Sequence, residues 1–73
     1  MSERKRMEEW MGEKGFSVTT LAEAIGDSYA NLYVMLVGKR KFSAAFKWRF
    51  LLAFGYAEAA SVFVEIATDK ASV

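Results

Sequence analysis

The chain has 73 residues, 53% of them hydrophobic, and a formal net charge of +1, and it contains neither cysteine nor histidine. This length fits one domain, 1–73, without a second. The missing residue types remove disulfides, thiolates, the usual zinc ligands and the Ser-His or Cys-His pairs of nucleophilic enzymes, so we expect no enzymatic activity, no metal and no cofactor. The apolar run 50–57 is too short to span a bilayer, and the charged start does not resemble a signal peptide, so we expect a cytoplasmic protein.

The spacing of the apolar residues predicts helices throughout the chain. The first helix is expected from about Glu3 to Lys14, with Ser2 as its N-cap. Its apolar stripe comprises Met7, Trp10 and Met11. A second helix is expected from about Val18 to Ile25, with Ser17 as its N-cap.

The second helix is followed by the pattern of a tight turn and a third helix. Ala22 is small enough for two helices to cross closely, and Gly26 reaches a positive φ without steric cost. Ser28 then caps a helix that is expected from about Tyr29 to Val37. A corner of this kind, here over about 18–37, holds its second helix where it can enter a DNA major groove.

Charge is distributed unevenly along the chain. Residues 28–57 carry five basic side chains and no acidic one, whereas residues 1–27 carry four basic and six acidic ones. Three of the basic residues directly follow the third helix, where a DNA phosphate beside the groove would lie. These candidate phosphate ligands are Lys39, Arg40 and Lys41. The alternative is that they only keep an apolar segment in solution.

Two further helices are expected in the second half. Ser43 caps a helix that runs to about Phe54 and ends at Gly55, and the last helix runs from about Ala57 to Thr68. The fourth helix is apolar on most sides and should therefore be buried on all sides, which one small core does not allow. We therefore expect a homodimer, with a monomer that exposes a few hydrophobic residues as the alternative. The candidate interface residues are Trp48, Leu52, Val62 and Val64.

Three segments resemble the lambda-repressor-like, or Xre-type, helix-turn-helix family. Residues 17–28 resemble the first part of that domain, residues 38–43 its glycine-basic loop, and residues 51–55 the end of its fourth helix. The resemblance covers about residues 4–67. It implies an all-α, compact five-helix DNA-binding domain that regulates transcription as a dimer. The size is similar to that of phage Cro-type proteins and short plasmid or prophage regulators.

The resemblance also implies which residues touch DNA. Val18 stands where the family usually has a phosphate-holding glutamine, so the backbone N–H of Val18 is the remaining phosphate donor at that helix start. The third helix has no Arg, Lys or Gln for a bidentate base contact, but Ala30 and Val34 fit thymine methyl groups. Tyr29 and Tyr33 either contact DNA or simply pack on the helix. The candidate base-reading residues are Ser28, Tyr29, Ala30, Asn31, Tyr33 and Val34.

We therefore expect a sequence-specific regulator of transcription, a Cro-like repressor that binds a palindromic operator in double-stranded DNA as a homodimer, associated with the nucleoid. No membrane or small-molecule partner is expected. Arg4, Lys5 and Arg6 are candidates for a flexible arm along the DNA backbone, with a solvated terminus as the alternative. The alternative function is a protein-interaction module of the same fold, such as an antirepressor that docks through its apolar third helix.

Overall fold

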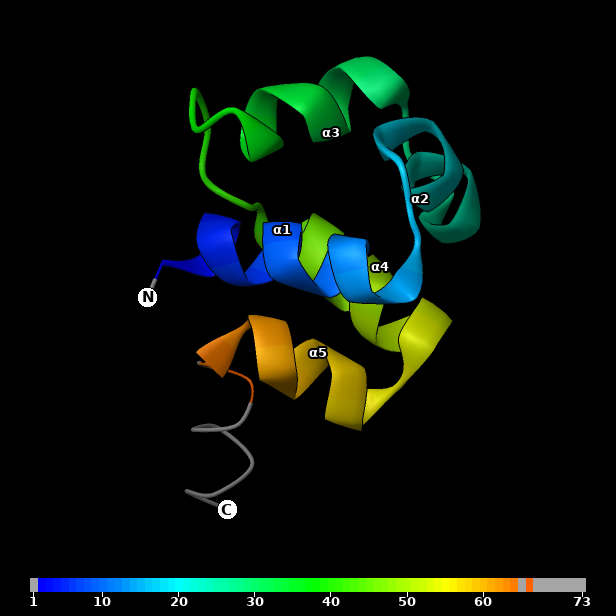
Figure 1. Cartoon of the computed structure of the whole chain (residues 1–73), viewed down its shortest axis with the longest axis vertical. Coiled ribbons are helices and arrows are strands. Elements are labelled where there is room, and N and C mark those ends of the chain that lie inside the picture. The colour runs from blue at the N-terminus through cyan, green and yellow to red at the C-terminus, as the bar shows by residue number, and fades with distance from the viewer. Residues whose placement is uncertain (1, 65, 67–73) are drawn as a thin grey trace.

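The computed structural model describes residues 2–64 and 66. These residues are all-helical, without a strand, and form one small bundle (Figure 1). The helices are α1 (Glu3–Lys14), α2 (Val18–Ile25), α3 (Tyr29–Leu36), α4 (Ala44–Phe54) and α5 (Tyr56–Val62). The all-α prediction is confirmed. In the described part of the chain, no helix is long and apolar enough to cross a membrane.

Serine side chains start the first four helices. Each serine Oγ accepts a hydrogen bond from the backbone N–H three residues later, which satisfies a donor that a helix start leaves without a partner. In α2, the side chain of Thr20 also binds back to the backbone of the cap and completes a capping box. The four caps are Ser2, Ser17, Ser28 and Ser43. The expected starts of α1 to α4 are therefore confirmed.

A turn of three residues, 26–28, joins α2 to α3. Gly26 has a φ of 73°, a left-handed conformation that glycine adopts without strain. The N–H of Asp27 donates to the carbonyl of Ala22 at 2.9 Å, and the N–H of Gly26 donates to the carbonyl of Glu23 at 3.3 Å. This Schellman motif ends α2 sharply and lets α3 leave at an angle (Figure 1).

The core is built around aromatic rings from α1, α4 and the end of α5. The ring of Phe50 lies 4.8 Å from that of Trp10 and 5.5 Å from that of Phe63, both edge to face. Each helix adds at least two buried apolar side chains, and the loop before α4 adds Phe42. The core comprises Met7, Trp10, Met11, Leu21, Ala22, Ile25, Leu32, Met35, Leu36, Phe42, Phe46, Phe50, Ala59, Val62 and Phe63. This packing holds α2 and α3 as one corner on the remaining helices.

The predicted last helix is interrupted at Phe63, and Val64 and Ile66 beyond it are again helical. α5 begins at Tyr56 and ends at Val62, and Phe63 has an extended backbone with φ −108° and ψ 94°. The fully buried ring of Phe63 packs against Phe42 and Phe46, so tertiary packing overrides the helical pattern there. The end that was expected at Thr68 lies outside the described residues.

Candidate nucleic-acid interface

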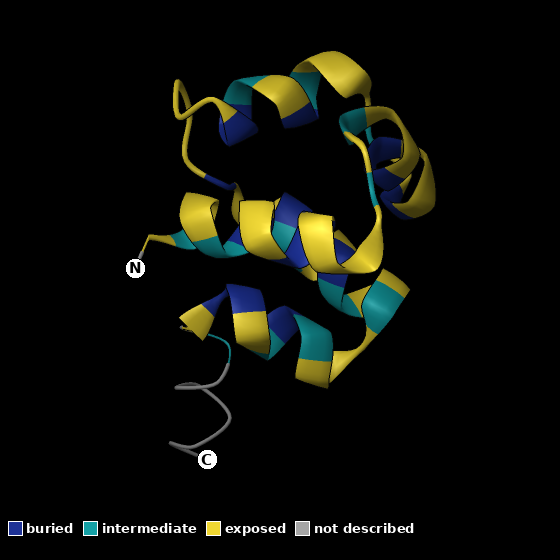
Figure 2. Ribbon diagram, in the orientation of Figure 1, coloured by how far each residue is buried: buried dark blue, intermediate teal, exposed yellow. Residues whose placement is uncertain are grey.

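α3 turns one side to the core and the other to solvent along its whole length (Figure 2). Leu32, Met35 and Leu36 are buried. The opposite side is formed by Tyr29, Ala30, Tyr33 and Val37, which are exposed, and by Val34, which is half-buried. Five of the predicted base-reading residues therefore lie on or beside an accessible surface, Ser28 included, although its Oγ also caps the helix.

Tyr29 and Tyr33 stack on each other along one flank of α3. Their ring centroids are 5.9 Å apart with an interplanar angle of 13°, as the one-turn spacing on a helix allows. Their side chains nevertheless stay 53% and 44% exposed. The stack orders two aromatic rings on the surface and leaves them accessible to a partner.

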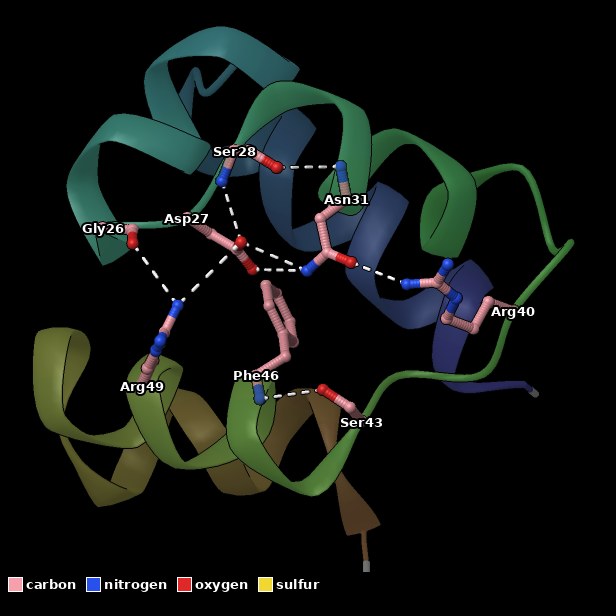
Figure 3. A network of polar contacts seen from close by, with 8 residues as sticks. All are labelled: Gly26, Asp27, Ser28, Asn31, Arg40, Ser43, Phe46 and Arg49. Carbon is pink, nitrogen blue, oxygen red and sulfur yellow. Dashed lines mark hydrogen bonds and ion pairs between the residues drawn. The ribbon is translucent and has the colours of Figure 1, made fainter.

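Asn31 lies on the opposite flank of α3, half-buried in a polar network (Figure 3). Its Nδ2 donates to both carboxylate oxygens of Asp27, at 2.9 and 3.1 Å, and its Oδ1 accepts from Nη1 of Arg40 at 2.8 Å. Asp27 also accepts from the N–H of Ser28 at 2.8 Å. The amide of Asn31 thus has partners on both its oxygen and its nitrogen within the protein.

Arg49 connects this network to α4. Its Nη1 donates to the carbonyl of Gly26 at 3.4 Å and lies 3.9 Å from Oδ1 of Asp27. The side chain of Asp27 is only 10% exposed, and the buried ring of Phe46 points toward it (Figure 3). The turn between α2 and α3 is therefore fixed to α4 by an ion pair and a hydrogen bond.

The basic loop folds back onto the C-terminal end of α3. The N–H groups of Lys39 and Arg40 both donate to the carbonyl of Val34, at 3.0 and 3.3 Å, and Gly38 has a φ of 87°. The side chains of Lys39, Arg40 and Lys41 are exposed. Positive charge is favourable at this position, because the carbonyls at a helix C-terminus carry partial negative charge.

The prediction of a flexible arm is wrong. Arg4, Lys5 and Arg6 lie in the first turns of α1, because Ser2 already caps the helix. Nη1 of Arg4 donates to the carbonyl of Val37 at 3.1 Å, and Nε of Arg6 donates to the carbonyl of Val62 at 2.8 Å. Two of the three side chains are therefore held against the ends of α3 and α5.

Arg4 and the basic loop line a shared cleft of about 630 Å³. Its walls carry four basic side chains and one acidic one, Glu3, whose Oε2 lies 3.1 Å from Nζ of Lys47. The basic side chains are Arg4, Arg40, Lys41 and Lys47. The start of α1 thus adds to the positive charge around the end of α3, as part of a helix and not as the flexible arm that was expected.

Of the four candidate residues for the dimer interface, three are exposed and one is buried. Trp48, Leu52 and Val64 are 61%, 70% and 50% exposed and remain candidates for a dimer interface. Val62 is wrong as an interface residue, because it is 1% exposed and belongs to the core. Burial of α4 on all sides does not occur within the single chain, since only the side with Phe46 and Phe50 faces the core.

The side chain of Val18 packs on the edge of the core and is half-buried. Packing thus explains the presence of valine at this position. A phosphate contact through the backbone N–H of Val18, at the start of α2, stays a prediction.

Comparison of the chain with protein-family models, with curated proteins and with solved structures found no match. The resemblance to the lambda-repressor-like family therefore stays a prediction from the sequence. Independently of it, the described residues place an exposed helix between a three-residue turn and a basic loop. A function has to be inferred from that surface.

Proposed function

We propose that the protein is a sequence-specific, double-stranded DNA-binding regulator in which α2 and α3 form a helix-turn-helix. One observation carries the proposal: the exposed side of α3 is continuous with a basic loop folded onto its C-terminal end. An α-helix fits the B-DNA major groove, which is about 12 Å wide. Cations beside such a helix lie where the phosphates border the groove.

Lys39 and Lys41 hold phosphates in this arrangement. Both side chains are exposed, so ordinary rotamer changes bring their ammonium groups to a backbone that passes the end of α3. Each phosphate neutralised by a lysine releases condensed counterions, which gives affinity without sequence preference. These contacts set the register in which α3 enters the groove.

The exposed side of α3 reads bases mainly through apolar contacts. Ala30 and Val34 face the groove and contact thymine methyl groups. Ser28 and the hydroxyl groups of Tyr29 and Tyr33 supply hydrogen bonds at one flank. This chemistry favours A·T pairs beneath the centre of the helix.

A second copy of the chain completes the regulator. Trp48 and Leu52 are one helical turn apart on the outer side of α4, and Val64 adds a further exposed apolar residue. A two-fold dimer through this surface presents two α3 helices to a palindromic operator with half-sites about 34–36 Å apart. Such a dimer would repress transcription by occupying the operator, in the cytoplasm and at the nucleoid.

A protein-interaction module, such as an antirepressor, is the second candidate. It is favoured by the stacked Tyr29 and Tyr33 and by an apolar cleft of about 440 Å³ beside Tyr33 and Val37. Exposed aromatic rings beside an apolar hollow are typical of protein-docking surfaces. Such binding would be nearly independent of salt, whereas DNA binding weakens steeply as salt rises.

Selection from random-sequence duplexes with the purified protein tests the proposal. We expect an enriched palindrome whose half-sites are centred about 10 base pairs apart. Affinity for that duplex should exceed affinity for a scrambled duplex by roughly 10³-fold or more at physiological salt. Recovery of no common sequence, with weak binding that varies little with salt, would instead support the protein-interaction module.

A further inference from the structure

The orientation of the Asn31 amide is determined by Asp27. An amide has one oxygen that accepts and one nitrogen that donates, and a carboxylate only accepts. Because both oxygens of Asp27 lie within 3.1 Å of Nδ2, the nitrogen must face the carboxylate. The oxygen Oδ1 therefore faces away from Asp27, toward the loop, where it accepts from Arg40.

This geometry brings a loop residue back to the start of α3. Asn31 lies in the first turn of α3, whereas Arg40 lies beyond its C-terminal end, nine residues later. The hydrogen bond of 2.8 Å holds the guanidinium along the flank of the helix (Figure 3). The N-terminal part of a recognition helix is the part that contacts base edges.

We infer that Arg40 reads a guanine in the major groove, with Asn31 and Asp27 as the residues that position it. The inference rests on the proposed function and assigns to Arg40 a different task from that of Lys39 and Lys41. It supplies what α3 itself lacks, since Tyr29–Leu36 contains no Arg, Lys or Gln. Arginine to guanine O6 and N7 is the commonest specific base contact.

The guanidinium remains competent for this contact. The acceptor Oδ1 is neutral and does not cancel the charge of Arg40. In the part of the chain that the structure describes, the side-chain contact of Arg40 uses Nη1. The Nε and Nη2 donors, which lie side by side on the guanidinium, are therefore available to the O6 and N7 acceptors of guanine. An arginine held in place before binding also loses less side-chain entropy when it meets the base.

Two other roles for Arg40 make different predictions. As a phosphate ligand, Arg40 would contribute equally to binding of every duplex and would be replaced by lysine with little loss. As a purely structural link between the loop and α3, it would affect the melting temperature and leave base preference unchanged. Of the three roles, only the reading of guanine by Arg40 makes discrimination between bases depend on Asn31.

The experiment uses the full chain and the duplex obtained by selection, with each guanine replaced in turn by 7-deazaguanine, which lacks only the N7 acceptor. We expect one replacement per half-site to weaken wild-type binding by roughly fivefold or more. Arg40→Ala and Asn31→Ala should bind the guanine duplex and the 7-deazaguanine duplex with affinities within about twofold of each other. The dependence of binding on salt should be unchanged, because neither side chain neutralises a phosphate in this arrangement.

Lys39→Ala is the matched control, because it removes one exposed charge from the same loop. It should weaken binding to all duplexes alike and keep the wild-type sensitivity to 7-deazaguanine. Replacement of guanine by hypoxanthine removes only the minor-groove amino group and should have no effect. If Asn31→Ala does not fold by circular dichroism, Arg40→Ala, whose side chain has no donor for guanine N7, decides the test alone.

Retention of the 7-deazaguanine effect by both Arg40→Ala and Asn31→Ala would overturn the inference. So would a selected operator without guanine in its half-sites, or an effect of hypoxanthine in place of 7-deazaguanine. These results leave the proposed function intact, because the wild-type protein still selects a duplex. Failure of the wild-type protein to prefer any duplex overturns the proposed function, and the inference with it.

Discussion

Glu58 on α5 accepts a hydrogen bond from the indole N–H of Trp10, and its Oε1 lies 3.5 Å from Nζ of Lys14. The hydrogen bond from Trp10 is the main cause that lowers the pKa of Glu58; desolvation opposes it, and the nearby Lys14 adds a smaller lowering effect. A carboxyl group whose pKa is lower in the folded than in the unfolded chain stabilises the fold above its unfolded pKa. That contribution is lost as pH falls through the folded pKa.

Glu58→Gln should therefore lower the melting temperature at pH 7, because glutamine keeps the shape of the side chain and loses its charge. The difference from the wild-type protein should shrink as pH falls below the ordinary glutamate pKa of about 4.3. Thermal unfolding followed by circular dichroism between pH 7 and pH 3 measures it. Glu13→Gln, at an exposed position of α1, is the control. An equal difference at pH 7 and pH 3 would contradict the assigned role of the charge.

Gly38→Ala should destabilise the fold by about 1–2 kcal/mol, the usual cost of the left-handed conformation for a residue with a Cβ. Gly38 has a φ of 87°, and an added Cβ would lie 2.5 Å from Nη1 of Arg4. Gly12→Ala is the matched control, since Gly12 is helical with no atom near its new Cβ, and it should stabilise by roughly 0.5–1 kcal/mol. Urea denaturation of both variants measures the two changes in the free energy of unfolding. If Gly12→Ala destabilises the fold as much as Gly38→Ala does, the cost at Gly38 does not come from its left-handed conformation.

Residues with a local role were predictable from the sequence. The serine caps and Gly26 act through backbone groups three to five residues away, so their neighbours in the chain determine their geometry. The contact of Asn31 with Arg40 was not predictable, because it depends on how the loop folds back in three dimensions. Base-reading and phosphate-binding residues were therefore assigned by position along α3, and the network between them was missed.

At the scale of elements, the proposed function assigns phosphate binding to the basic loop and base reading to α3, and the two tasks can be tested separately. Lys39→Ala should reduce the slope of log affinity against log salt concentration by about 0.9 for each phosphate that is no longer neutralised, or roughly two units in a dimer. Lys14→Ala removes the same charge from the C-terminal end of α1, away from the basic loop, and should leave the slope unchanged. Fluorescence anisotropy with the selected duplex at salt concentrations from about 50 to 200 mM measures both slopes. Equal slopes for Lys39→Ala and the wild-type protein would show that Lys39 does not hold a phosphate.

The boundaries of the helices were predictable where a cap and an apolar stripe agree, as in α1, α2 and α4. The break in the last helix at Phe63 was not predicted, because it accompanies the burial of the Phe63 ring against aromatic rings from distant parts of the chain. The apolar residues on most sides of α4 indicated a surface for a partner, but they did not show which residues form that surface. Only the packed structure separates the exposed Trp48 and Leu52 from the buried Val62.

At the scale of the whole molecule, the proposed dimer depends on an exposed apolar surface. Trp48→Glu should yield monomers in sedimentation equilibrium and weaken operator binding at the same time, since each monomer then contacts one half-site. Folding should be unaffected, because Trp48 is 61% exposed in the single chain. Thr19→Glu, at an exposed position on α2, is a control that should leave the mass unchanged. A wild-type protein that sediments as a monomer at high concentration would contradict the proposed interface.

The central claim is that α3 reads DNA, and uracil substitution tests it most directly. In the selected duplex, each thymine is replaced in turn by uracil, which lacks only the C5 methyl group. We expect one position per half-site to lose affinity in the wild-type protein, by up to about fivefold, because a methyl contact contributes less than the ~1–3 kcal/mol of a bidentate pair. Val34→Ala should abolish that effect and leave non-specific binding unchanged. If no uracil substitution changes the affinity, and changes at Tyr29, Ala30 and Val34 preserve the preferred sequence, α3 does not read the DNA.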